Sequence, residues 1–151
     1  MTKVTIIGAG SAVFTKNIVT DLLSLDSFKK IEITLQDIDP IRLKASHELL
    51  NIISSKLNAS PKITSHTNRR ESLVGSDFVQ TTIQVGGYKP STLIDFKIPS
   101  EFGLKQTIAD TLGIGGIMRG LRTIPVLLDI AKDVMEICPN AIWLQYVNPM
   151  C

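Results

Sequence analysis

The chain has 151 residues, 44% of them hydrophobic, and a formal net charge of +2. This length and composition allow one domain with a buried core, and the scattered, nearly balanced charge argues against binding to nucleic acid or to a membrane surface. No apolar run reaches the roughly 18 residues that span a bilayer, and the N-terminus shows no signal peptide. The two cysteines, Cys138 and Cys151, lack metal-binding spacing. We therefore expect a soluble protein of the reducing cytoplasm.

Short β-branched runs alternate with longer amphipathic runs along the chain. The pattern predicts strands at 3–7, 31–35, 62–66, 77–85 and 141–147, and helices at 11–25, 41–57, 71–74 and 117–137, the last with a kink at Pro125. Residues 88–116 are rich in glycine and are predicted to form a long irregular loop, which is usually functional or disordered. This order predicts a Rossmann-type α/β fold with a doubly wound, mainly parallel sheet covered on both faces.

A glycine-containing loop joins the first predicted strand to the first predicted helix. In this context Gly8 permits a tight turn, Gly10 lets the backbone approach a pyrophosphate, and Ser11 begins a helix whose N-terminus attracts anions. Val13 stands where the third glycine of a dinucleotide-binding fingerprint is usual, so we expect wider packing of this helix on its strand. The loop predicts a dinucleotide site.

Acidic residues end the second predicted strand. Asp37 lies where a carboxylate would accept hydrogen bonds from the adenosine ribose hydroxyls, and its charge would repel a 2′-phosphate. NAD is therefore favoured over NADP. Asp39 is the alternative ribose ligand, or it caps the helix that begins at Pro40.

Further candidates follow the fourth and fifth predicted strands, because function in open α/β sheets lies at the carboxyl ends of the strands. Gly86 and Gly87 would border the path of the pyrophosphate and nicotinamide ribose, and the Asn148 amide could bond a ribose or substrate hydroxyl. Asp110 and Arg119 place charges among glycines. Simpler interpretations stay open: Gly113, Gly115 and Gly116 as a flexible helix start, Arg119 and Arg122 as surface charges, Asn148 as a turn residue, and His47 and His66 as structural.

Several longer motifs carry a family resemblance. They are residues 3–11 (KVTIIGAGS), 37–40 (DIDP) with Arg42 and Leu43, 108–113 (IADTLG), 115–119 (GGIMR), 121–125 (LRTIP), Cys138-Pro139 and 146–150 (YVNPM). Over its whole length the chain resembles glycoside hydrolase family four, and the later motifs resemble its melibiase-type α-galactosidases.

The resemblance implies a glycosidase that needs NAD and a divalent metal, typically manganese. Bound NAD takes a hydride from sugar C3, a base removes the acidified C2 proton, the C1–O bond breaks by elimination, water adds, and the hydride returns. The metal polarises the C2 and C3 oxygens. Gly8, Gly10 and Ser11 would hold the pyrophosphate and Asp37 the ribose, Gly86 and Gly87 would line the cofactor path, Asp110 would be the active-site acid, and Asn148 would contact sugar hydroxyls.

Differences between this sequence and the family pattern bear on the substrate and on how much of the enzyme the chain contains. Phosphosugar-specific members tend to carry an Arg soon after the double glycine, where this chain has Lys89, so an unphosphorylated α-galactoside such as melibiose is implied. The family's metal-binding Cys and His would lie beyond residue 151, and Cys151 itself is not assigned that role. We therefore expect residues 1–151 to be the NAD-binding domain of a larger two-domain enzyme, inactive alone, with an exposed apolar face and a homo-oligomeric full-length form.

Two other functions remain open on the residues alone. A lactate- or malate-dehydrogenase-like oxidoreductase would share the strand order, the Asp after the second strand and Asn148-Pro149, although the long block of residues 107–125 argues against it. A non-catalytic NAD-binding module would need only the cofactor residues.

Overall fold

The computed structural model describes residues 1–108 and 111–149. The candidate acid Asp110 and the unassigned Cys151 therefore lie outside the described residues. Two compact units make up the chain: unit 1 contains Met1–Thr82 and Asp133–Gln145, and unit 2 contains Ile83–Lys132 and the residues that follow Gln145.

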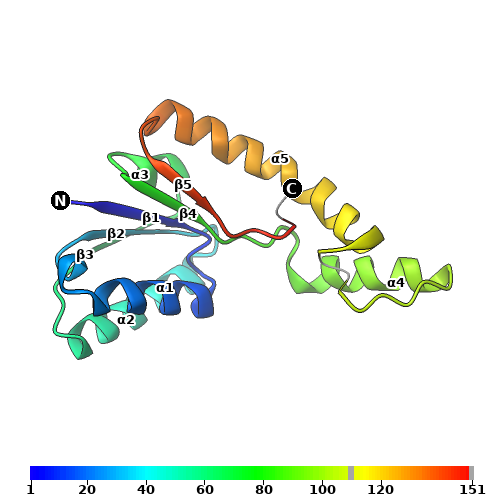
Figure 1. Ribbon diagram of the computed structural model, residues 1–151, viewed down its shortest axis with the longest axis horizontal. Coiled ribbons are helices and arrows are strands. Elements are labelled where there is room, and N and C mark those ends of the chain that lie inside the picture. The colour runs from blue at the N-terminus through cyan, green and yellow to red at the C-terminus, as the bar shows by residue number, and fades with distance from the viewer. Residues whose placement is uncertain (109–110, 150–151) are drawn as a thin grey trace. The chain divides into compact units, whose positions relative to one another are not determined.

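Unit 1 is built on a five-stranded parallel sheet (Figure 1). Its strands are β1 (Lys3–Ile7), β2 (Glu32–Gln36), β3 (Lys62–His66), β4 (Phe78–Thr81) and β5 (Ile142–Gln145). They lie in the order β3-β2-β1-β4-β5, and each neighbouring pair is parallel. The predicted Rossmann-type sheet is confirmed, and β1 and β3 have the predicted bounds.

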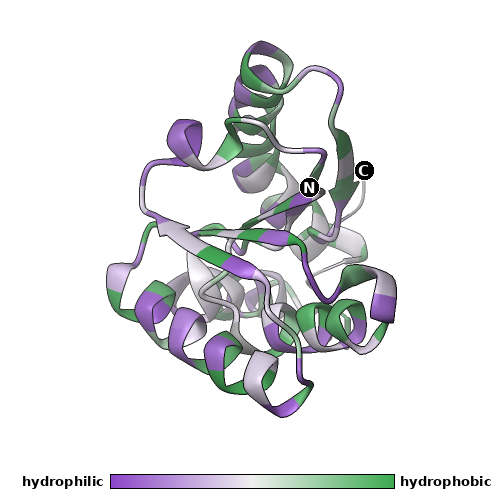
Figure 2. Cartoon of the chain, turned by 90° about the vertical axis from the view of Figure 1, so that its left-hand side faces the viewer, coloured by the Kyte–Doolittle hydropathy of each residue, from purple (hydrophilic) through white to green (hydrophobic). Residues whose placement is uncertain are grey.

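One face of this sheet packs against α1 (Ala12–Ser24) and α2 (Pro40–Lys56), which lie side by side below the strands in Figure 1. Both helices carry hydrophobic and hydrophilic residues along their length (Figure 2), as one-sided packing requires. A short 3₁₀ turn, η1 (Asp26–Phe28), follows α1. The core joins strand residues to residues of both helices: Val4, Ile6, Ile33, Leu35, Val19, Leu23, Leu43 and Leu50.

The opposite face carries α3 (Arg69–Leu73). A buried polar contact connects α3 to the sheet, because Thr5 Oγ1 donates to the Ser72 carbonyl at 3.1 Å. Arg69 and Arg70 both bond the carboxylate of Asp133, which belongs to the end of α5 and to the same unit. This buried carboxylate therefore links α3 to α5.

Strand register brings the candidate loops of unit 1 to one edge. Ile7, the last residue of β1, pairs with Gln36 of β2 and with Thr81 of β4. Three neighbouring strands thus end together, and the residues that follow β1 and β2 emerge from the same edge of the sheet.

Unit 2 differs most from the prediction. It contains the π-helical turn η2 (Gly87–Thr92), α4 (Leu93–Glu101) and most of α5 (Gly113–Ile137). The expected loop over 88–116 therefore contains a helix, and α5 begins four residues earlier than predicted and continues past Pro125. Prolines at positions 90 and 99 obscured α4, since proline is rare inside helices.

Two strands are shorter than predicted. β4 ends at Thr81 because its partner β1 ends at Ile7, and the Thr82 N–H closes this edge by donating to the Ile7 carbonyl at 2.8 Å. The following residues turn toward Gly86, whose φ is 81°. β5 likewise spans only the residues that pair with β4.

Candidate cofactor site

The glycine loop of unit 1 forms the predicted tight turn. Gly8 has a φ of 85°, a conformation that favours glycine. The backbone N–H groups of Gly8 and Ala9 both donate to the Gln36 carbonyl at 2.9 Å. The Ala9 carbonyl accepts from Thr15 Oγ1 at 3.0 Å and from Ser46 Oγ at 2.7 Å. The turn is therefore fixed by β2, α1 and α2 together.

The N-terminus of α1 follows this turn directly. Ser11 is the N-cap residue, yet its side chain makes no capping hydrogen bond, and no acidic residue lies in the first turn. First-turn N–H groups have no partner within their own helix and carry the positive end of the helix dipole. This end of α1 can therefore receive a phosphate group.

Val13, at the place of the usual third glycine, lies on the exposed side of α1. Its side chain is 65% exposed, whereas Val19 and Leu23 of the same helix are fully buried. The wider packing of α1 on β1 stays a prediction.

Asp37 lies against the glycine loop. Its Oδ2 accepts from the Gly10 N–H at 2.7 Å, and its Oδ1 accepts from the Asp39 N–H at 2.9 Å. A Cβ at position 10 would lie only 2.6 Å from Asp37 Oδ2 and 2.9 Å from the Cβ of Arg42. Glycine is therefore required at position 10 by the carboxylate itself, in addition to the approach of a pyrophosphate that the sequence predicts.

Asp39 has a different role. Its Oδ1 accepts from the N–H groups of Ile41 and Arg42 at 2.9 and 3.1 Å, as an N-cap of α2 does. Of the two interpretations left open by the sequence, helix capping describes Asp39. Asp37 stays the predicted ribose ligand.

The double glycine of unit 2 forms a left-handed turn, with φ of 81° at Gly86 and 64° at Gly87. A Cβ at position 86 would lie 1.9 Å from Ser91 Oγ, so internal packing explains this glycine. A Cβ at position 87 would meet no atom within 4 Å. The backbone of Gly87 is therefore open to approach by a ligand.

The remaining sequence candidates divide into structural and untested residues. His47 Nδ1 bonds Ser65 Oγ at 2.6 Å, and His66 lies 3.6 Å from a Glu71 oxygen, so both histidines have structural partners. Asn148 is an exposed bend residue.

The glycines at the start of α5 are held by specific contacts. The Gly115 N–H donates to Gln106 Oε1 at 3.0 Å, and a Cβ at position 116 would lie 2.5 Å from the Thr111 carbonyl oxygen. These contacts give the backbone at Gly115 and Gly116 specific partners.

Arg122 is not a plain surface charge. Its guanidinium bonds both carboxylate oxygens of Asp95, a residue of α4 that is 1% exposed. The sequence reasoning missed Asp95 and Gln106, because both fall in the stretch predicted to be irregular.

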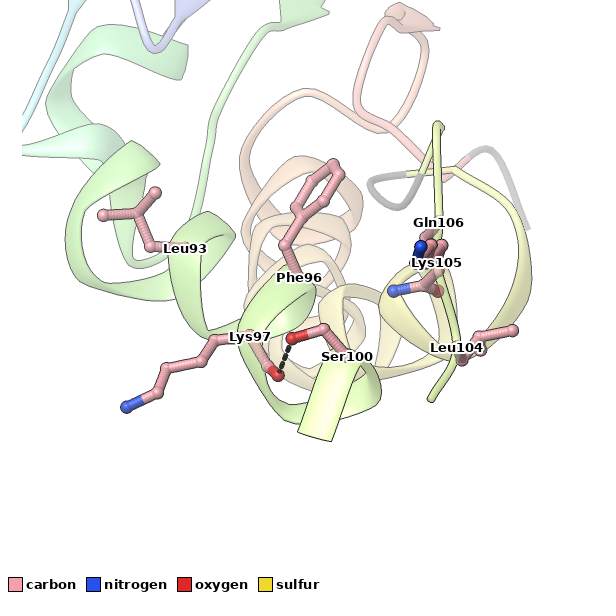
Figure 3. Close-up of a pocket in the computed structure, with 7 residues that line it drawn as sticks. All are labelled: Leu93, Phe96, Lys97, Ser100, Leu104, Lys105 and Gln106. Carbon is pink, nitrogen blue, oxygen red and sulfur yellow. Dashed lines mark hydrogen bonds between the residues drawn. The ribbon is translucent and has the colours of Figure 1, made fainter. Parts of the chain in front are cut away.

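A pocket of about 480 Å³ lies along α4 in unit 2 (Figure 3). In Figure 3 the Ser100 hydroxyl bonds the Lys97 carbonyl, at 2.7 Å. The lining residues are Leu93, Phe96, Lys97, Ser100, Leu104, Lys105 and Gln106.

Metal ligands do not cluster in the described part of the chain, where no group of three or more His, Cys, Asp or Glu side chains could hold an ion. Burial raises the pKa of the Cys138 thiol. Among the described residues no helix is long and apolar enough to cross a membrane.

Comparison with known proteins gives the family. The model of family 4 glycosyl hydrolases matches residues 3–151. The chain belongs to glycosyl hydrolase family 4. Family 4 membership therefore favours a glycosidase over the lactate- or malate-dehydrogenase-like oxidoreductase considered above.

Within family 4 the chain is similar to two alpha-galactosidases. It is 53% identical to that of Bacillus subtilis (strain 168), covering 99% of this chain and 35% of the relative, and 38% identical to that of Rhizobium meliloti (strain 1021), covering 98% and 30%. A crystal structure of a 6-phospho-alpha-glucosidase from gut microorganisms, in complex with NAD and Mn²⁺, matches with a TM-score of 0.85 at 26% identity, covering 98% of this chain and 33% of that one. The chain thus spans about a third of the length of these relatives.

Proposed function

We propose that residues 1–151 form the NAD-binding domain of an α-galactosidase. The NAD-binding part of this proposal rests on the hydrogen bond from the Gly10 N–H to Asp37 Oδ2, because it joins the glycine loop to the acid at the end of β2. The loop and the first turn of α1 would hold the pyrophosphate, and Asp37 would bind the adenosine ribose. The similarity to alpha-galactosidases and to an NAD-bound family structure supports the same reading.

Asp37 would also select the cofactor. Its carboxylate is fixed by two backbone N–H groups, from Gly10 and Asp39, and keeps lone pairs for ribose hydroxyls. A 2′-phosphate at the same place would meet this charge at short range. We therefore assign NAD rather than NADP to the site.

In the whole enzyme, bound NAD supplies a hydride acceptor for oxidation at sugar C3, which permits elimination across C1 and C2. Asp110 would be the acid of this chain at the reacting sugar, Asn148 would bond sugar hydroxyls, and an unphosphorylated α-galactoside would be the substrate. Among the described residues, no group of three or more His, Cys, Asp or Glu side chains could hold Mn²⁺. We expect residues 1–151 alone to bind cofactor without hydrolysing a glycoside.

An exposed apolar stripe on α5 supports self-association of the 151-residue chain. Its residues recur at intervals of three and four, which places them along one side of the helix. Large exposed apolar patches mark interaction surfaces, and light scattering over a concentration series tests for association. The stripe consists of Ile114, Ile117, Leu121, Ile124 and Leu128.

Two neighbouring carboxylates provide the test of the cofactor site. Asp37→Ala removes the proposed ribose ligand and should weaken NAD⁺ binding about tenfold or more, since hydrogen bonds to charged groups contribute about 1.5–3 kcal/mol. Asp39→Ala removes a helix cap, worth about 0.5–2 kcal/mol of stability, and should leave NAD⁺ affinity nearly unchanged. Calorimetric titration of both variants with NAD⁺ measures the two affinities. Equal affinities for the two variants would contradict the assignment of Asp37.

A further inference from the structure

The sheet of unit 1 is covered unevenly on the side that carries α1 and α2. Val4 and Ile6 of β1 belong to the core that these two helices cover. Phe78 of β4 pairs with Val4. Gln80 of β4 pairs with Ile6 in the same register. Paired residues of neighbouring parallel strands lie on the same face of a sheet, so Phe78 and Gln80 belong to the α1/α2 side.

β5 continues this face to the edge of the sheet. Ile142 pairs with Phe78, and Leu144 pairs with its neighbour on the same face, Gln80. Both β5 side chains therefore lie on the α1/α2 side, yet Ile142 is 56% exposed and Leu144 44%. The other exposed large hydrophobic residues of the described chain lie outside the strands. The two helices thus leave the β5 part of this face uncovered.

The opposite edge of the same face is closed. β3 is the other edge strand, and α2 contacts it. Its Ile63 packs against the hydrophobic core. β3 also carries Lys62, whose ammonium nitrogen lies 3.2 Å from a Glu32 oxygen, and a charged residue on an edge strand opposes pairing with another chain. β5, with the sequence IWLQ, carries no charge. The uncovered edge is therefore also the edge without this protection.

A buried amide lies beside Leu144 in the sheet. Gln80 is 2% exposed, and neither its Nε2 nor its Oε1 atom has a hydrogen-bond partner among the described residues. A buried polar group without a partner is destabilising, and native proteins contain few of them. Neighbouring strands are about 4.8 Å apart, so a side chain placed over Leu144 would be close enough to bond the Gln80 amide.

The length of the relatives indicates what covers this face. The chain covers 35% of the Bacillus subtilis alpha-galactosidase and 30% of the Rhizobium meliloti one, so about two thirds of each lies outside the matched region. Parallel sheets occur almost only with helices on both faces. An amphipathic helix can place an apolar stripe on Ile142 and Leu144 and one polar side chain toward Gln80.

We propose that Gln80, Ile142 and Leu144, the β5 patch, are the docking surface for an amphipathic helix from the rest of the longer enzyme. One amide or hydroxyl group of that helix bonds the Gln80 amide. The inference rests on the part of the proposed function that makes residues 1–151 a domain of a larger enzyme. It does not depend on NAD binding, and all three residues belong to unit 1.

The test compares the 151 residues alone with the same residues joined to the unmatched part of the Bacillus subtilis alpha-galactosidase. Leu144→Cys should react with a maleimide readily in the chain alone and roughly tenfold more slowly or less in the joined form, because a covered thiol reacts only after local opening. Ile52→Cys, at an exposed position of α2, is the matched control and should react equally in both forms. Peptide mass spectrometry locates the label.

Gln80→Met tests the amide itself. Methionine keeps the length of the side chain without its polar atoms, so it should raise the melting temperature of the chain alone, where the amide has no partner. In the joined form it should lower the melting temperature, because the bond to the docked helix is lost.

Three results would overturn the proposal. Equal labelling of Leu144→Cys in the two forms would show that nothing covers the β5 patch. A lower melting temperature of Gln80→Met in the chain alone would show that the amide already has a partner there. Labelling of the chain alone that slows as its concentration rises would identify a second copy as the occupant. NAD⁺ titration tests the cofactor site separately, so either proposal can fail while the other stands.

Discussion

The contact between Gly10 and Asp37 gives the sharpest prediction about the cofactor site. In Gly10→Ala the new Cβ would lie 2.6 Å from Asp37 Oδ2, about 1 Å closer than carbon and oxygen atoms pack comfortably. Either the loop or the carboxylate must move, and the 2.7 Å hydrogen bond from the Gly10 N–H is then lost or lengthened. A hydrogen bond to a charged group contributes about 1.5–3 kcal/mol.

The same displacement should affect cofactor binding. If it costs Asp37 one of its hydrogen bonds to the ribose, the NAD⁺ dissociation constant rises about 10- to 100-fold, since about 1.4 kcal/mol corresponds to a factor of ten. Calorimetric titration measures this change, and thermal unfolding in parallel measures the stability loss.

Gly75→Ala is the matched control in the same unit. Gly75 has a φ of 73° and open space around its Cβ position, so alanine there strains the backbone by about 1–2 kcal/mol without touching the candidate site. It should lower stability and leave NAD⁺ affinity unchanged. A folded Gly10→Ala variant that binds NAD⁺ as tightly as the unchanged chain would refute the reasoning.

Two further predictions concern charge and packing. Burial alone would raise the pKa of Asp133, but hydrogen bonds from Arg69 and Arg70 outweigh it and hold this pKa below its usual value. The ionised Asp133 carboxylate therefore stabilises the fold above the unfolded pKa of about 4, and this stabilisation is lost as pH falls through the lower folded pKa. In thermal melts from pH 7 to pH 3, the difference in melting temperature between the unchanged chain and the Asp133→Asn variant should shrink as the pH falls. Gly86→Ala should unfold at a clearly lower temperature than Gly87→Ala in the same melts, because only at position 86 would a Cβ overlap Ser91 Oγ; equal melting temperatures would contradict this.

Local signals in the sequence predicted most of unit 1. The alternation of β-branched strands with amphipathic helices, and Gly8 before a helix, determine the sheet and its first turn, because these features act over a few neighbouring residues. Asp37 could be predicted as the acid after the second strand. That it also bonds the Gly10 N–H could not, since strand register brings together residues 27 positions apart.

The structure of unit 2 could not be predicted because its helices are held by contacts between side chains that are far apart in the sequence. Pro90 before α4 and Pro99 inside it conceal this helix, which is held by contacts of Asp95 with residues far along the chain. Arg122 resembles a surface charge on a helix until its partner is known. The family motifs included Arg122 without giving its role, and only the geometry connects it to the turn at Gly86.

The most direct measurement is a calorimetric titration of the 151-residue chain with NAD⁺, alongside an assay of p-nitrophenyl α-galactoside hydrolysis with NAD⁺, Mn²⁺ and reductant. We predict saturable NAD⁺ binding that Asp37→Ala weakens, and no hydrolysis by these residues alone. Absence of NAD⁺ binding would contradict the cofactor site. Hydrolysis by the chain would show that it supplies the metal ligands and base that we expect beyond residue 151.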